Sequence, residues 1–126
     1  MKNMLQMAAF ISFIAPGMAL AGPQFPSGFR GVWVTPTANC KSAKQGEGDG
    51  NWMTIAKDNV RGYEWGCDLK TARTSADKGL NAKLDCSSSG DGYTQTLNYT
   101  LNKSSLKVTS WGDDGKPSAT IYTRCK

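Results

Sequence analysis

Four cysteines are the side chains whose type and spacing point most directly to chemistry: Cys40, Cys67, Cys86 and Cys125. An even number of cysteines in a small exported domain indicates a disulfide framework, so we expect two bridges. A structural zinc site needs cysteines a few residues apart or histidines, whereas these cysteines are widely separated and the chain has no histidine. We therefore predict no metal site, and nothing else in the sequence indicates a cofactor.

The absence of histidine also limits catalysis. Ser–His and Cys–His nucleophilic pairs cannot be built, and the commonest general base is missing. Ten acidic residues remain, but most of them lie in segments with turn chemistry, where Asp is explained by its backbone hydrogen bonds. We predict a protein that is not an enzyme, and the alternative is a hydrolase with two carboxylates in one pocket.

Residues 47–51 place oxygen ligands at alternate positions, as calcium-binding loops do, with Asp58 at the distance of a closing acid. The sixth position of such a loop needs glycine for a sharp turn, and here it is Trp52. We interpret this segment as a loop before a strand.

Alternation of apolar and polar residues is the main signal of secondary structure. Leu80, Ala82, Leu84 and Cys86 share one parity, with polar residues between them, which is the pattern of a half-buried strand. Turn residues interrupt this alternation at short intervals, so neighbouring strands should be antiparallel. We predict an all-β fold, a single small up-and-down barrel or strongly curled sheet of about seven strands, with a two-sheet sandwich as the alternative. The strands are expected near 31–35, 52–57, 60–73, 79–86, 92–101, 104–111 and 118–125.

The same pattern predicts the bridges. A hairpin turning about residues 76 and 77 sets Cys67 opposite Cys86, because residues whose numbers sum to 153 then face each other. Cys40 follows the first strand and Cys125 ends the last, so both arrive at one end of the structure. The predicted pairs are Cys67–Cys86 and Cys40–Cys125.

An outward-facing patch is predicted on the last two strands. A hairpin centred between residues 114 and 115 sets Lys107 opposite Tyr122 and places Trp111 and Arg124 on the same side. Exposed aromatic rings beside cations suit sugars, an anionic polymer or a protein partner. In the alternative, Trp111 folds over the barrel mouth as a lid.

The segment from Ser89 to Tyr93 reads SGDGY and has the form SGxxY. It resembles the loop motif of periplasmic and membrane-bound inhibitors of C-type lysozyme, which are small exported β-barrels. The resemblance implies that Ser89 and Tyr93 enter the active-site cleft of that enzyme. The alternative is an ordinary hairpin turn.

A wider spacing spans most of the chain: Gly31-Val-Trp33, the Tyr-Glu-Trp-Gly-Cys run ending at Cys67, and Arg124-Cys125. It is similar to that of small exported four-cysteine bacterial proteins of uncharacterised function. The resemblance implies an exported β-domain and supplies no activity.

The first 21 residues predict a secretory signal, with one cation at Lys2, a short apolar run and a cleavage site after Ala21. We expect an extended lead-in at 22–28, a β-domain at 29–126, a periplasmic or secreted location and no membrane span after cleavage. Of 15 basic residues only Lys2 leaves with the signal, so 14 basic and 10 acidic residues give the domain a charge of +4. These charges are dispersed, which argues against nucleic acid as a partner.

Together these observations predict a non-enzymatic binding or inhibitory module of the bacterial envelope, whose partner is a protein or an anionic polymer or glycan. Two alternatives stay open. One is a structural protein without a specific ligand, and the other is a C-type lysozyme inhibitor acting through the 87–93 loop.

Overall fold

The computed structural model describes residues 22–48, 50–75 and 79–126. The predicted signal at residues 1–21 and Asp49 of the calcium-like segment lie outside these ranges. Within them, no helix combines the length and apolar character needed to cross a bilayer.

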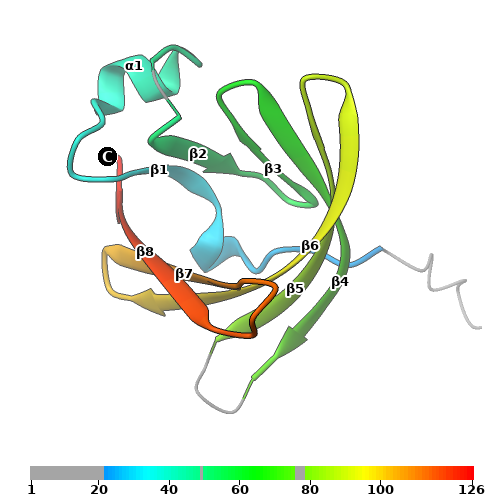
Figure 1. The fold of residues 1–126 in the computed structure, drawn as a ribbon. Coiled ribbons are helices and arrows are strands. Elements are labelled where there is room, and N and C mark those ends of the chain that lie inside the picture. The colour runs from blue at the N-terminus through cyan, green and yellow to red at the C-terminus, as the bar shows by residue number, and fades with distance from the viewer. Residues whose placement is uncertain (1–21, 49, 76–78) are drawn as a thin grey trace, which may run out of the picture.

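The chain forms a closed antiparallel β-barrel of eight strands in sequence order, each paired with the next and the last paired with the first (Figure 1). The predicted all-β barrel with two disulfides is confirmed, and the sandwich alternative is wrong. The strands are β1 (Gly31–Val34), β2 (Trp52–Ile55), β3 (Asn59–Gly62), β4 (Trp65–Thr74), β5 (Leu80–Ser88), β6 (Asp91–Asn102), β7 (Ser105–Trp111) and β8 (Pro117–Arg124). A 3-10 helix, η1 (Ser27–Phe29), precedes β1, and a short helix, α1 (Cys40–Lys44), lies between β1 and β2.

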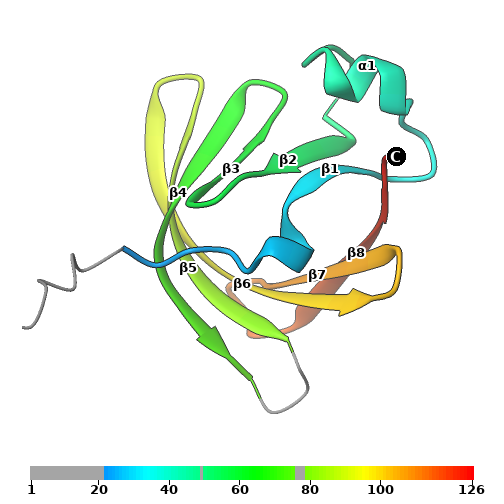
Figure 2. The same ribbon diagram turned by 180° about the vertical axis from the view of Figure 1, so that it is seen from behind.

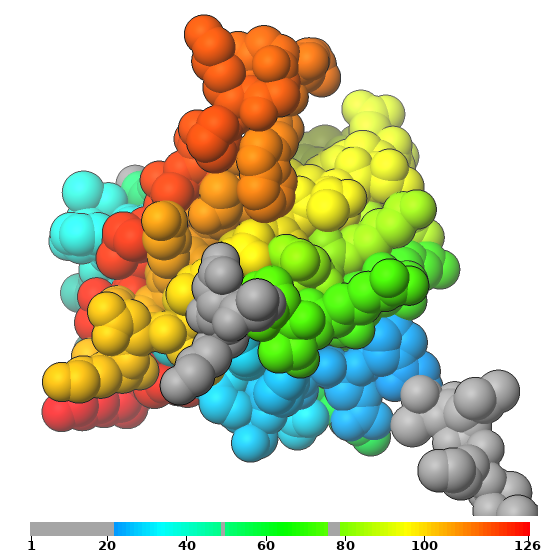
Figure 3. All heavy atoms as spheres, turned by 90° about the horizontal axis from the view of Figure 1, so that it is seen from below, coloured from blue at the N-terminus to red at the C-terminus, as the bar shows by residue number. Residues whose placement is uncertain are grey.

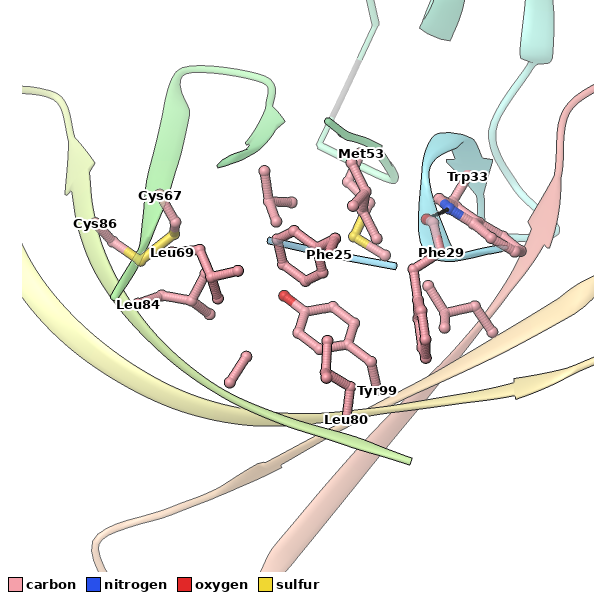
Figure 4. Close-up of a cluster of buried hydrophobic side chains, with 14 residues drawn as sticks. Phe25, Phe29, Trp33, Met53, Cys67, Leu69, Leu80, Leu84, Cys86 and Tyr99 are labelled. Carbon is pink, nitrogen blue, oxygen red and sulfur yellow. Dashed lines mark hydrogen bonds between the residues drawn. A yellow bond between two sulfur atoms is a disulfide. The ribbon is translucent and has the colours of Figure 1, made fainter. Parts of the chain in front are cut away.

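The inward face of β5 follows the predicted alternation. Leu80, Ala82, Leu84 and Cys86 are buried, and the residues between them are exposed. They pack with residues of other strands into the main hydrophobic core, which lies inside the barrel (Figure 4). Removal of these apolar side chains from water is the main driving force for closing so small a barrel.

The expected single strand at 60–73 is two strands. β3 ends at Gly62 and β4 begins at Trp65, with Tyr63 and Glu64 forming the turn between them. Glu64 has a φ of 60°, which is uncommon for a residue other than glycine. The alternation of Tyr63 with Trp65 and Cys67 continued through this turn, so the pattern hid it. Tyr63 is in fact 46% exposed.

The lead-in forms part of the core. Phe25 is completely buried, its backbone N–H donates to the carbonyl of Lys57 at 2.7 Å, and its ring meets that of Tyr99 edge-to-face at 5.4 Å. Phe29 of η1 is also buried. Figure 2 shows this N-terminal segment crossing one end of the barrel, and we call these residues, 22–30, the N-terminal plug. The structural domain therefore begins before the expected boundary at residue 29.

Both disulfides join the pairs expected from the sequence. Cys67 and Cys86 face each other across β4 and β5. Cys40 is bonded to Cys125 by a route that differs from the expected one, because β8 runs antiparallel to β1 and brings Cys125 beside Val32. The chain after β1 folds back through α1, which starts at Cys40, and so reaches Cys125. Asn39 starts this helix by accepting hydrogen bonds from the backbone N–H groups of residues 41 and 42.

Candidate functional site

The two ends of the barrel differ. The N-terminal plug covers one end, and the other end opens into a cavity of about 310 Å³, which we call the barrel mouth. The residues that line it include Trp65, where β4 begins, and Ser88 and Ser110, near the ends of β5 and β7. Pockets of this kind, at the mouth of a barrel and near 300 Å³, are suited to a single small molecule.

The lining of the mouth combines apolar and polar side chains, and its polar groups are uncharged. Met53, Leu97 and Val108 contribute aliphatic surface, and the disulfide at Cys67 forms part of the wall. Polar contacts are available from Ser88, Gln95, Ser110 and Thr120 and from Tyr93 and Tyr122. Tyr99 also borders the mouth but is only 1% exposed. None of the described residues that line the mouth is charged at neutral pH. An ion bound here would lose its hydration without gaining a counter-charge, so the mouth favours an uncharged ligand.

Two of the tyrosines keep their protons well into the alkaline range. Burial raises the pKa of Tyr99 above its ordinary value of 10.0, and the neighbouring Tyr122 raises it further. Burial also raises the pKa of Tyr122. Both hydroxyls are therefore neutral at physiological pH and can donate as well as accept hydrogen bonds.

Tyr122 was expected on the outer surface, and the structure places it inside. β7 and β8 pair so that Leu106, not Lys107, is opposite Tyr122. The loop from 112 to 116 has an odd number of residues, closed by Gly112 N–H to the Lys116 carbonyl at 3.1 Å, and this shifts the register by one residue. Since side chains alternate, a shift of one moves the whole strand to the other face. Tyr122 packs against the core, and Ile121 is 52% exposed instead.

Arg124 also differs from expectation, because its guanidinium is engaged within the fold. It lies over the Trp33 ring at 4.2 Å and donates to the backbone carbonyls of Arg30, at 2.6 Å, and Gly28. Trp33 in turn donates from Nε1 to the Phe29 carbonyl at 2.9 Å. We call these contacts the Arg124 clamp. They tie the last strand to the N-terminal plug and leave Arg124 no role in an outer patch.

The SGDGY segment forms the β5–β6 turn. Ser88 pairs with Asp91, so Ser89 and Gly90 are a two-residue loop. Both have positive φ, 50° and 87°, which is the type I′ geometry that matches the twist of a hairpin. Ser89 lies at the exposed tip, whereas Tyr93 pairs with Cys86 and lines the mouth, 42% exposed at its rim.

Lys107 and Trp111 face outward on β7. Trp111 is 48% exposed and is not among the residues that line the mouth, so the alternative in which it covers the mouth as a lid is wrong. The structure therefore divides the predicted patch into Lys107 and Trp111 on the outside, Tyr122 inside and Arg124 in the clamp.

Several residues of the mouth were not predicted, among them Trp65, Gln95 and Thr120. A usable signal existed on β6, where Tyr93, Gln95, Leu97 and Tyr99 share one parity. The alternation was recognised from Leu97 onward, and extending it by four residues toward the N-terminus, through Gln95, would have placed Tyr93 on the inner face.

A wider hollow of about 600 Å³ lies on the outer face of β3 to β6, where Gly66 and Gly92 leave the surface low. Asp68 and Asp85 are direct cross-strand neighbours there, and Lys70 pairs with Asp85 at 3.1 Å. Within the described residues no three acidic, cysteine or histidine side chains come together to hold a metal ion. This hollow is lined by charged side chains, among them Arg61, Asp68 and Asp85, whereas the described lining of the barrel mouth carries none.

Comparison of the chain with models of known protein families, with characterised proteins and with solved structures gives no match, so its function is argued from the barrel itself.

Proposed function

We propose that the protein is a non-enzymatic binding module that takes a small, uncharged molecule with apolar surface and a few polar groups into the barrel mouth. The observation that carries this proposal is the charge-free lining of a cavity of about 310 Å³, in which aliphatic surface lies beside tyrosine hydroxyls. Burial of apolar ligand surface supplies affinity, and a few polar groups fix orientation.

Rigidity of the mouth supports the same proposal. The Cys67–Cys86 bridge ties β4 to β5 at the wall of the cavity, and the Arg124 clamp holds the opposite end closed. A cavity that is already formed loses little conformational entropy when it binds, which favours affinity.

The test is a fluorescence titration of the purified, oxidised protein with N-phenyl-1-naphthylamine, an uncharged apolar dye. Ser110→Trp fills the mouth, and Thr109→Trp adds the same side chain to the outer face of the same strand. We expect saturable binding by the unchanged protein and by Thr109→Trp, and at least about tenfold weaker binding by Ser110→Trp. Equal binding by the two variants contradicts the proposal. No saturable binding by any form supports the alternative of a structural protein without a ligand.

The bridges are typical of an oxidising compartment outside the cytoplasm. We further propose that residues 1–21 are a cleaved signal and that the mature protein is periplasmic or secreted. Expression of the full chain in a Gram-negative host tests this, because the exported product should begin at Gly22 by mass spectrometry. An uncleaved or cytoplasmic product contradicts it.

The exposed tip position of Ser89 favours one second candidate, inhibition of C-type lysozyme by the β5–β6 turn. Lysozyme activity in the presence of excess protein tests it, with Tyr93→Ala as the variant that should relieve inhibition. Full lysozyme activity in the presence of the unchanged protein excludes this candidate.

A further inference from the structure

A second hollow, of about 330 Å³, lies on the outer face of β5, β6 and β7, and we call it the outer groove. Asn81, Asn98 and Thr109 form one row across these strands, and Thr100 and Lys107 form the next. Trp111 stands at the end of β7. Figure 3 looks onto this face, with the β7–β8 turn projecting beyond the strands.

The polar side chains of the outer groove hold one another in place. Asn98 Nδ2 donates to Asn81 Oδ1 at 2.7 Å, and Thr100 Oγ1 donates to Asn98 Oδ1 at 2.9 Å. The orientation of both amides is thereby fixed, so the Nδ2 hydrogens of exposed Asn81 are presented as donors and the Thr100 oxygen keeps acceptor capacity.

Gly79 allows this arrangement. A Cβ at this position would come within 3.1 Å of both Asn98 Nδ2 and Thr100 Oγ1, and within 2.9 Å of Ser75 Oγ. The network therefore packs against a backbone that carries no side chain, and its geometry is set by the fold.

The groove joins this neutral network to one aromatic ring and one cation. Trp111 is 48% exposed and lines the groove, so its indole ring is accessible there. Lys107 is exposed, and within the part of the chain that the structure describes it forms no ion pair. No acidic residue is among those described as lining the groove.

We propose that the outer groove binds an acidic saccharide. The apolar C–H face of a sugar ring packs on an indole, its hydroxyls match the amide and hydroxyl groups of Asn81, Thr100 and Thr109, and a carboxylate on the sugar pairs with Lys107. A nucleic-acid strand fits less well, because its backbone calls for several cations and the groove offers one. This site is on the opposite face of the barrel wall from the mouth and does not depend on the function proposed for the mouth.

The test is an NMR titration of the isotope-labelled, oxidised protein with a tetrasaccharide of hexuronic acid and with its neutral hexose counterpart. We expect shifts of the Asn81 and Asn98 side-chain amides and of the Trp111 indole, with a dissociation constant on the order of millimolar. The acidic sugar should bind about fivefold more tightly than the neutral one at low salt, and this preference should disappear at about 1 M salt.

Two variants assign the roles. Trp111→Ala should weaken the binding of both sugars about tenfold, and Lys107→Gln should remove only the preference for the acidic sugar. Tyr63→Ala removes another exposed aromatic ring, away from the groove, and should change neither affinity. Thermal unfolding of each variant verifies that it is folded, and Trp111→Phe gives a milder form of the first change. The proposal fails if no shift occurs at about 20 mM sugar, if shifts are confined to the mouth, if Lys107→Gln keeps the preference, or if a single-stranded oligonucleotide binds this face more tightly than the sugar.

Discussion

Phe25 provides the sharpest test of the fold, because the N-terminal plug is either part of the core or a dispensable lead-in. Its ring is completely buried, packs edge-to-face against Tyr99, and lies among the core side chains seen in Figure 4. We expect Phe25→Ala to destabilise the domain strongly, although the residue precedes the first strand.

The magnitude follows from the buried surface. A phenylalanine buries about 150 Å² or more, and at about 25 cal/mol per Å² this contributes about 4 kcal/mol. Replacement of a core phenylalanine by alanine costs about 3–5 kcal/mol in general. We therefore expect the free energy of unfolding to fall by about 4 kcal/mol, which is a large part of the roughly 5–15 kcal/mol by which small domains are stable. At about 4–8 °C per kcal/mol, the melting temperature should fall by about 20 °C.

The assay is urea unfolding of the oxidised protein followed by circular dichroism, with Tyr63→Ala as the matched control. Tyr63 is 46% exposed in the β3–β4 turn, so its loss should cost no more than about 0.5 kcal/mol. If the free energy of unfolding of Phe25→Ala lies within about 1 kcal/mol of that of the unchanged protein, the plug contributes no packing and the reasoning is refuted.

Three further outcomes are expected. Arg124→Lys should cost about 1–3 kcal/mol in urea unfolding, because lysine cannot stack on Trp33 while donating to two carbonyls; Lys103→Ala, at an exposed turn, is the control. Loss of Cys40–Cys125, which spans 85 residues, should cost about 4.5 kcal/mol in the chain-entropy model, and loss of Cys67–Cys86, which spans 19, about 3 kcal/mol; the reverse order in paired Cys→Ala variants contradicts that model. Because the pKa of Tyr99 is raised, the folded state holds this proton to higher pH than the unfolded chain does. The stability that the protonated hydroxyl contributes is therefore complete below its ordinary pKa of 10.0 and is lost as the pH rises above that value. Urea midpoints measured from pH 9 to about 12 should show this decline, and Tyr99→Phe should flatten it; an unchanged slope in Tyr99→Phe assigns the decline to other groups.

Strand alternation predicted the parts of the fold in which local pattern and tertiary packing agree. β5 is the clearest case, since its parity and the Cys67–Cys86 pairing follow from the sequence. The register differs from the expected one nearer the turn, because an irregularity between Leu69 and Thr71 shifts the pairing by one residue. The pattern failed where a turn lacked turn chemistry, as at Tyr63-Glu64, whose positive φ at Glu64 is stabilised by the hairpin on either side.

The candidate site was harder to predict because it depends on loop length and on distant contacts. One residue in the 112–116 loop decides whether Tyr122 points into the barrel or away from it. Arg124 donates to carbonyls of residues that lie 94 and 96 positions earlier in the chain, and no local sequence pattern encodes such contacts. In the sequence, Phe25 is a single aromatic residue among prolines and glycines, and its burial depends on the end of the barrel that it fills.

The Arg124 clamp also sets the order in which the molecule can assemble. The final strand supplies the pairing with β1, the guanidinium over Trp33 and, just beyond it, the sulfur that reaches Cys40. Contacts of such high sequence separation form late and slowly, since the intervening chain must be ordered first. A chain that lacks β8 therefore cannot close this barrel, because only the pairing of β8 with β1 completes the ring of strands.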